Sequence, residues 1–326
     1  MKREESFVGE YKELLEAFVK QKRMLGYKYD TTCDNLGRFS RYTLNYRIDN
    51  KNLSKELVSD WTARRQNESD KTWMHRASDL RQFARYLHNQ GYNAFIPPKC
   101  HKMSRNTFTP YIFTHEEIQN FIRVVDSIAP HPKSNKSQSY PLLFRLLYCS
   151  GLRISESFHI KISDVDFEKG TLIIRASKFS KDRIIPLSPS LASMFIRYHD
   201  LFNRNKSAKD FYFTNKNGTP LSSSWVYKVY RKLLWKAGIS HGGKGKGPRI
   251  HDLRHTFCVH TLAKQVKDGV DLYVALPILS VYLGHSSVVA TQGYIRLTAE
   301  AYPDLIKKIS ETCAYILPEV TINETN

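Results

Sequence analysis

The stretch HDLRHTFCVH, residues 251–260, concentrates three histidines and one arginine in a segment with helical spacing. On a helix, positions i, i+3 and i+4 share a face, so His251, Arg254 and His255 are expected to project together while Leu253 and Phe257 face the core. Two histidines four residues apart can ligate zinc, but the arginine between them repels a cation and an HExxH glutamate is absent. A guanidinium beside imidazoles favours an anion, because its planar fork binds two oxygens. The stretch therefore predicts an anion site and no metal.

The chain as a whole is basic. Its 326 residues include 50 Lys and Arg against 31 Asp and Glu, a formal charge of +19. This excess favours a polyanion such as nucleic acid as partner, with a solvated basic surface as the alternative. Five scattered cysteines without a CxxC pair favour a reducing compartment. No apolar run approaches the roughly 18 residues of a membrane span, and MKREESFVGE lacks a signal-peptide core, so we expect a cytoplasmic protein without a membrane segment.

Residues 1–98 are expected to form a helical domain. Helical spacing of apolar side chains begins in FVGEYKELLEAFVKQKRML and continues through DNLGRFSRYTLNY, SKELVSDWTARRQ and TWMHRASDLRQFARYLHNQ. Paired prolines in the next segment suit neither helix nor strand, which predicts a linker over 99–113. The arginines of the helices are candidate DNA contacts, unless they only solubilise the helices. These candidates are Arg41, Arg64, Arg65, Arg76, Arg81 and Arg85.

Residues 114–326 are expected to form a second domain in which helices accompany a small antiparallel sheet. THEE, residues 114–117, is a capping-box start, and SYPLLFRLLYCSG is a buried helix that ends at Gly151. TLIIRA and RIIPL flank SKFSKD, which predicts two strands joined by a lysine-bearing turn, and FYFTNKNGTPL predicts a further strand and turn. Helical spacing returns after Ser223. It is interrupted by the loop HGGKGKGP, which lacks P-loop spacing and whose Lys244 and Lys246 are expected near DNA.

Four stretches, in chain order, resemble the signature boxes of the tyrosine recombinase family, also called phage-type integrases. They are CSGLRISE, SKFSKDR, HDLRHTF and LGHSSVVATQGY, within a resemblance that spans about Thr114 to Tyr294. The resemblance implies a mainly helical α+β catalytic domain with a small antiparallel sheet and a C-terminal tail. It also implies an N-terminal helical core-binding domain, here matched by length and class without a motif. No metal or other cofactor is implied.

The resemblance further implies which residues carry out the chemistry. Arg153 and Arg254 match the two arginines that clamp the scissile phosphate. His251 and His285 match the two histidine positions. Tyr294, nine residues after His285, matches the nucleophile.

Other residues of the boxes are given supporting roles. Glu156 matches the acidic position that supports the first arginine. Lys178 matches a general acid on the hairpin, with Lys181 as the alternative because this turn lacks the glycines common in the family. His255 and His260 are expected to be structural, although His255 shares the basic face.

These residue types suit attack on a phosphodiester. The attack places negative charge on nonbridging oxygens, which two guanidiniums can neutralise without a metal. A phenol with a pKa of about 10 needs a positive neighbourhood and a proton acceptor such as His251. The departing 5′-oxygen needs a proton, which Lys178 can donate. The product that the family implies is a 3′-phosphotyrosyl ester with a free 5′-hydroxyl, formed without ATP.

The sequence thus predicts a site-specific recombinase acting on double-stranded DNA. Extensions near 130–139 and 264–273 favour a mobile genetic element, and the helical region begins too near Met1 for an additional arm-binding unit. By resemblance, the tail AYPDLIKKISETCAYIL docks on a neighbouring subunit to give a homotetramer on two paired sites, unless it packs on its own domain. A type IB topoisomerase and a DNA-binding regulator without catalysis are the alternatives. Accessory proteins and the target sequence stay open.

Overall fold

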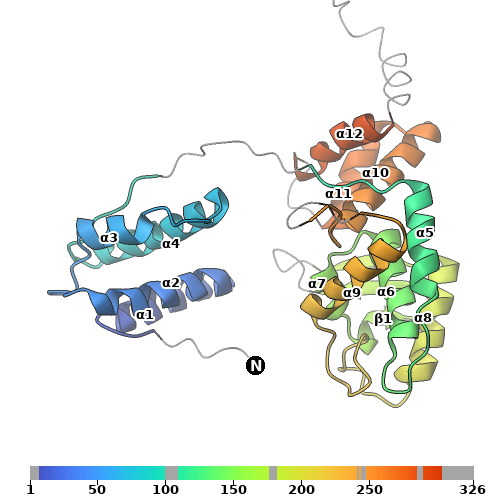
Figure 1. Ribbon diagram of the computed structural model, residues 1–326, viewed down its shortest axis with the longest axis horizontal. Coiled ribbons are helices and arrows are strands. Elements are labelled where there is room, and N and C mark those ends of the chain that lie inside the picture. Colours follow the sequence, from blue (N-terminus) through green and yellow to red (C-terminus); the bar gives the residue numbers. More distant parts are fainter. Residues whose placement is uncertain are drawn as a thin grey trace, which may run out of the picture. The chain divides into compact units, whose positions relative to one another are not determined.

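The computed structural model describes residues 7–99, 109–175, 182–240, 242–243, 247–284 and 289–302. The chain divides into two compact units, unit 1 from Met1 to Thr107 and unit 2 from Phe108 to Asn326 (Figure 1). Each unit encloses its own hydrophobic core.

Unit 1, described over residues 7–99, is built from helices joined by turns and loops. Its α-helices are α1 (Lys12–Met24), α2 (Asp30–Tyr42), α3 (Lys55–Thr62) and α4 (Asp70–Asn89), with a 3-10 turn at Thr43–Asn45. Ser54 and Ser69 cap α3 and α4 through hydroxyls that accept from backbone N–H groups of the first turn. Helix α4 packs against the other three helices and buries Leu80 and Phe83 completely. The helical prediction for this region is confirmed.

Unit 2 is built around one central helix, which is buried over most of its length. The helices are α5 (His115–Asp126), α6 (Lys136–Ser150), α7 (Ile154–Phe158), α8 (Pro189–Phe202), α9 (Ser223–Lys236), α10 (Asp252–Lys267), α11 (Leu272–Leu283) and α12 (Val289–Ala301). The buried helix is α6, which packs against α5, α8 and α10. As predicted, Thr114 and Glu117 form a capping box before α5, and α6 ends at Gly151 in the left-handed conformation.

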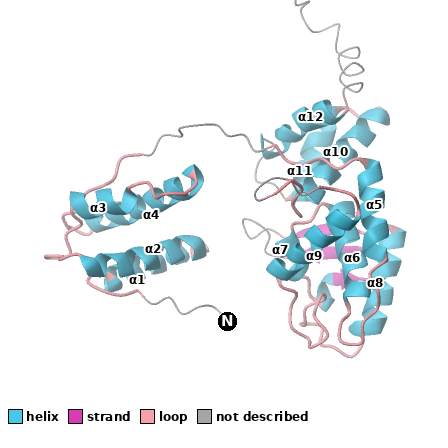
Figure 2. Cartoon of the chain, viewed as in Figure 1, coloured by secondary structure: helices cyan, strands magenta, loops and turns pink. Residues whose placement is uncertain are grey.

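A small antiparallel sheet of short strands accompanies these helices (Figure 2). Strands β1 (Val165–Asp166), β2 (Thr171–Ile174) and β3 (Arg183–Pro186) pair in the order β1-β2-β3, next to a 3-10 turn at Ile162–Asp164. Leu172 of β2 pairs with Ile185 of β3, and both side chains are fully buried. The two strands predicted around the lysine turn are confirmed, while residues 176–181 of the turn itself lie outside the described residues.

The further strand predicted in FYFTNKNGTPL is wrong. In the described chain this segment makes only the isolated bridges Lys161↔Phe211 and Thr214↔Pro220. Tyr212 and Phe213 are neighbours in sequence and both are fully buried. A strand would place them on opposite faces, so the segment suits a core-filling loop better than a strand with one solvated face.

The structure extends unit 2 toward the N-terminus beyond the residue predicted as its start. Phe113 lies in the expected linker, yet its side chain is 1% exposed and its N–H donates to Oγ1 of Thr256 on α10 at 3.1 Å. Tyr111 and Ile112 also pack against the hydrophobic clusters of unit 2, so residues 111–113 belong to its packing.

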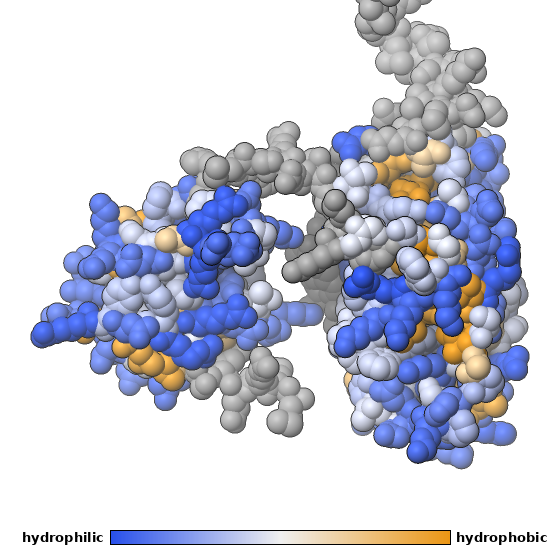
Figure 3. All heavy atoms as spheres, viewed as in Figure 1, coloured by the Kyte–Doolittle hydropathy of each residue, from blue (hydrophilic) through white to orange (hydrophobic). Residues whose placement is uncertain are grey.

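The surfaces visible in Figure 3 are largely hydrophilic on both units, in keeping with the many charged side chains of the sequence. Within the described ranges, every helix is too short or too polar to cross a membrane.

Candidate active site

Arg254 lies in the first turn of α10 and points into unit 2, where its side chain is 1% exposed. Its Nη1 donates to the carbonyl of Gly151 at 2.6 Å, and its Nη2 donates to the carbonyl of Leu283 at 2.9 Å. Because Gly151 ends α6 and Leu283 ends α11, the guanidinium ties the ends of two helices to α10. The sequence placed Arg254 on an exposed basic face of the helix; the buried carbonyls at the helix ends instead draw it inward.

Gly151 makes this arrangement sterically feasible. Its φ is +59°, and a Cβ at this position would lie 2.5 Å from Cδ1 of Phe257 on α10. Only glycine adopts this left-handed conformation without strain while leaving room for the ring. The close approach of α6 to α10 fixes where the chain continues into Leu152 and Arg153.

Arg153, two residues later, is held by a buried carboxylate. Its Nη1 donates to Oε1 of Glu156 at 2.8 Å, and its backbone N–H donates to Oε2 at 2.9 Å. The Arg153 side chain is 24% exposed, whereas that of Glu156 is 8% exposed. The arginine is therefore positioned from its inner side and remains accessible from its outer side, as a phosphate-binding group requires.

Arg183, at the start of β3, binds the same carboxylate and was not singled out from the sequence. Its Nη2 donates to Oε2 of Glu156 at 2.7 Å, and its Nη1 donates to Oε1 at 3.2 Å. Burial alone would raise the pKa of Glu156, but the hydrogen bonds and charge of Arg183, with those of Arg153, outweigh it and lower the pKa. The sequence feature that could have indicated this role is the position of Arg183 at the end of the motif SKFSKDR.

Arg183 also reaches the segment that leads to the second predicted histidine. A Cβ on Gly284 would lie 3.1 Å from Nη1 of Arg183, so the guanidinium packs directly on the glycine backbone. Arg183 thus joins the strands, the start of α7 and the end of α11. His285 itself lies outside the described residues, as do Lys178, Lys181, Lys244 and Lys246.

Tyr294, on α12, is buried against α10. Its side chain is 5% exposed, and its hydroxyl lies 3.1 Å from Nδ1 of His255. Burial raises the pKa of the phenol above its usual value, the nearby Cys258 thiol adds to this, and Arg254 opposes it. His255, which the sequence placed among the structural residues, is therefore a direct neighbour of the predicted nucleophile. Its position one helical turn after His251 was the signal.

His251 stands at the N-cap of α10 with its ring 4.9 Å from that of His255. The residue as a whole is solvent-exposed. Partial burial of the imidazole, which disfavours its charged form, together with the charges of Arg254 and Arg153, lowers the pKa of His251 to about 4. The imidazole is consequently neutral at pH 7 and can accept a proton. Among the described residues, no group of three His, Cys, Asp or Glu side chains is arranged to hold a metal ion.

The candidate arginines of unit 1 fall into different environments. Arg76 is 5% exposed, and its Nη2 lies 2.6 Å from Oε2 of Glu68 and 2.9 Å from the carbonyl of Ala63. Its expected place on a DNA-facing surface is corrected: this guanidinium belongs to the interior, because a buried glutamate requires it. Arg65 lies 4.8 Å over the ring of Trp61, and Arg64 pairs with Asp70. Exposed to solvent are Arg41, Arg64, Arg65 and Arg85, and half-buried is Arg81.

Comparison with known proteins agrees with this arrangement. Residues 112–301, more than half of the chain, match the model of the phage integrase family. The y4rB protein of Sinorhizobium fredii, whose name assigns it to the integrases and recombinases, is 28% identical over 92% of this chain and 96% of its own length. The tyrosine recombinase XerA of Thermococcus onnurineus is 30% identical over 73% of this chain and 74% of its own length.

A solved structure shares the fold. The Tn1549 transposon integrase, in complex with transposon right end DNA, is 20% identical, with a TM-score of 0.64 over 92% of this chain and 99% of that one. The family match over 112–301 and the Xer relative show that the chain belongs to the phage integrase family, the tyrosine recombinases.

Proposed function

We propose that the chain is a site-specific DNA recombinase that breaks and rejoins duplex DNA through Tyr294. One contact supports this most directly: the Tyr294 hydroxyl lies 3.1 Å from Nδ1 of His255, the residue that follows the buried Arg254 in the chain. A tyrosine, a proton acceptor and a guanidinium are the groups needed to form a phosphotyrosyl ester without a metal.

The two arginines would hold the scissile phosphate. Arg153 is accessible from outside and Arg254 is fixed from inside by the carbonyls of Gly151 and Leu283. Guanidiniums set in place before the reaction can stabilise charge on the nonbridging oxygens without reorganising. Glu156 and Arg183 would act by orienting Arg153 and not by touching the phosphate.

Tyr294 would attack the phosphorus once its proton is accepted. His255 is the adjacent acceptor, and neutral His251 stands next to it on the outer side. Because the phenol is 5% exposed and burial raises its pKa, we infer that this arrangement precedes DNA binding. DNA binding would have to bring the oxygen out of this packing, which requires α12 to shift relative to α10.

The remaining steps follow from the chemistry of the ester. The Tyr294 oxygen forms a bond to phosphorus, and the bond to the 5′-oxygen of the strand breaks. The leaving oxygen takes a proton, for which we propose Lys178, or Lys181, with His285 as a further donor to the phosphate. A 5′-hydroxyl from a second duplex then attacks the ester and releases the tyrosine, so the bond energy is conserved.

Both units are proposed to bind the same double-stranded DNA. In unit 2 the binding group is the active site, and in unit 1 we propose the exposed Arg41 and Arg85, with residues up to about 98 acting as the core-binding domain. Exchange between two sites would require a homotetramer. The Tn1549 transposon integrase and the extension at 130–139 favour a role in a mobile genetic element, in the cytoplasm.

Two assays test the proposal. Duplexes of random sequence with a nick near each potential cleavage position would trap a covalent complex, since the short cleaved strand diffuses away. A supercoiled plasmid with two copies of the mapped site would then report exchange. Relaxation without exchange would favour a type IB topoisomerase, and binding without any covalent complex would favour a regulator.

A further inference from the structure

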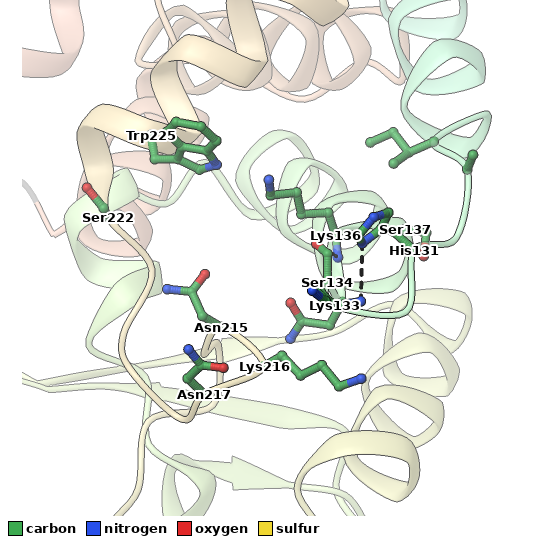
Figure 4. Close-up of a pocket in the computed structure, with 13 residues that line it drawn as sticks. His131, Lys133, Ser134, Lys136, Ser137, Asn215, Lys216, Asn217, Ser222 and Trp225 are labelled. Atoms are coloured by element: carbon green, nitrogen blue, oxygen red, sulfur yellow. Dashed lines mark hydrogen bonds between the residues drawn. The ribbon is translucent and has the colours of Figure 1, made fainter.

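We propose that a lysine-lined pocket at the start of α9 binds a backbone phosphate of the same duplex, outside the cleavage position. This inference rests on the proposed function. The pocket, here called the lysine pocket, measures about 660 Å³ and lies between residues 128–137, the turn 215–217 and the first residues of α9 (Figure 4). It is distinct from the catalytic residues, none of which lines it.

The lysine pocket is positively charged. Lys133, Lys136 and Lys216 line it together with His131, and its lining contains no carboxylate. The other polar groups are hydroxyls and amides, including Ser134, which can donate to an anion but carry no charge. Such a lining attracts phosphate oxygens and contains no negative charge that would favour a cation.

An exposed tryptophan holds one of these lysines. The Nζ of Lys136 lies 4.8 Å from the centre of the Trp225 ring, toward which its side chain points in Figure 4. Lys228 approaches the same ring at 6.0 Å. The negative face of the indole stabilises an ammonium group and restricts the lysine chain. Although Trp225 is large and apolar, it remains 49% exposed, so it positions charge at the edge of the pocket more than it fills a core.

The walls of the pocket are built from the loop 131–135 and the turn 215–217, which are tied together. The ammonium of Lys216 donates to the carbonyl of Pro132, which connects the two. Asn135 is 6% exposed, and its Nδ2 donates to the carbonyl of Thr214 at 2.7 Å. Binding a phosphate would therefore cost little ordering of the protein.

The position of the pocket favours duplex DNA over a small anion. Ser222 lines the lysine pocket and also a neighbouring pocket, which contains Arg249 together with His251 of the candidate active site. The two pockets thus open at the same helix start. A DNA strand whose scissile phosphate lies at His251 carries further phosphates and can therefore place one in the lysine pocket at the same time. A free anion could occupy only one of the two pockets.

A contact of this kind would fix the register of the DNA without reading its sequence. Phosphate contacts orient a protein on the duplex, and each releases a counterion on binding. The loop 131–135 lies in the extension noted in the sequence, so the contact would be a feature of this chain and not of the shared motif boxes.

The test uses the full chain with the double variant Lys133→Gln/Lys136→Gln. No hydrogen bond or ion pair is formed by either ammonium in the described structure, so the fold should be retained, which a thermal melt verifies. The control is Lys169→Gln/Lys209→Gln, which removes two exposed lysines of unit 2 outside the pocket, at the cost of one exposed ion pair between Lys169 and Asp166. Affinity for a random duplex is measured against salt concentration. We expect the slope of log affinity against log salt to fall by about one to two in the pocket variant and to stay unchanged in the control.

A second measurement locates the contact. In covalent complexes trapped on nicked duplexes, the cleavage position fixes how the protein is aligned along the DNA. Ethylation of single phosphates then shows which phosphates are needed for the complex to form. The wild type should be sensitive at a phosphate outside the cleavage position, and the pocket variant should lose that sensitivity alone. An unchanged salt slope in the pocket variant, or loss of binding only to free inorganic phosphate, would overturn the inference while covalent complexes still form. Absence of covalent complexes in the wild type would instead refute the proposed function, and the salt slope would remain interpretable.

Discussion

Arg183 and Arg153 bind the two oxygens of one buried carboxylate, that of Glu156. Nη2 of Arg183 lies 2.7 Å from Oε2, and Nη1 of Arg153 lies 2.8 Å from Oε1. The Glu156 carboxylate thereby orients the accessible Arg153 from its buried side, and Arg183 fixes the carboxylate in place.

Replacing Arg183 should slow cleavage without weakening DNA binding. In Arg183→Gln, Glu156 loses its inner partner and Arg153 its fixed orientation; a misplacement of about 1 Å costs roughly 100-fold in rate. Single-turnover formation of the covalent complex on a nicked duplex measures this. Arg145→Gln is the control, because Arg145 likewise pairs with a carboxylate, that of Asp126, but this carboxylate is 45% exposed and does not contact Arg153. Equal rates in the two variants would show that Arg183 does not position Arg153.

The Glu156 carboxylate also predicts a pH dependence of stability. Its pKa is lower in the folded chain than in the unfolded one, because Arg183 and Arg153 outweigh burial. A lowered pKa means stabilisation that is complete above the unfolded pKa of about 4.3 and is lost as pH falls through the folded pKa. Wild type should therefore exceed Glu156→Gln by about 3 kcal/mol in unfolding free energy at pH 7. Urea unfolding should show this difference shrinking below pH of about 4; a constant difference at all pH values would argue against the ion pairs.

Substitution by alanine should lower the stability of the fold more at Gly151 than at another glycine in the same backbone conformation. In Gly151→Ala the left-handed backbone adds strain of about 1–2 kcal/mol, and the Cβ, 2.5 Å from Cδ1 of Phe257, adds overpacking of about 1–3 kcal/mol. Gly238→Ala isolates the strain, since its φ is +76° and an added Cβ would meet no atom within 4 Å outside its own stretch of chain. Chemical denaturation compares the two. Matching losses would mean that α10 moves away from α6 at no cost.

Two arginines of α4 should separate stability from DNA binding. Arg76 pairs with Glu68 in the interior, so Arg76→Gln should lower the unfolding free energy by about 3 kcal/mol, because the Glu68 carboxylate would keep the Arg65 N–H but lose its charged partner. Arg85 is exposed, so Arg85→Gln should change stability by less than about 0.5 kcal/mol. The same variant should reduce the salt slope of DNA affinity by about one. A salt slope in Arg85→Gln equal to that of the wild type would show that Arg85 does not contact the DNA.

Local signals in the sequence predicted much of this fold. The capping box at Thr114 and Glu117 and the glycine that ends α6 depend on interactions between near neighbours, and both appear as expected. The motif boxes likewise predicted the family. What they could not predict was which way a side chain turns when a distant partner decides it. Arg254 points inward because carbonyls at residues 151 and 283 lie there, and Arg76 because Glu68 is buried.

The role of His255 illustrates the same limit within the site. Helical spacing put it on the face of His251, but only the packing of α12 on α10 brings Tyr294 within 3.1 Å of its ring. The partnership between Arg183 and Glu156 is of this kind, since 27 residues separate them in the chain.

In the proposed reaction, the phenol of Tyr294 becomes covalently joined to the cut strand. Tyr294→Phe and Tyr302→Phe remove one hydroxyl each from the α12 region, and both are incubated with nicked duplexes before denaturing electrophoresis. Tyr302→Phe and the wild type should give a covalent complex whose DNA-linked peptide contains Tyr294, and Tyr294→Phe should give none. A covalent complex that persists in Tyr294→Phe would contradict the account.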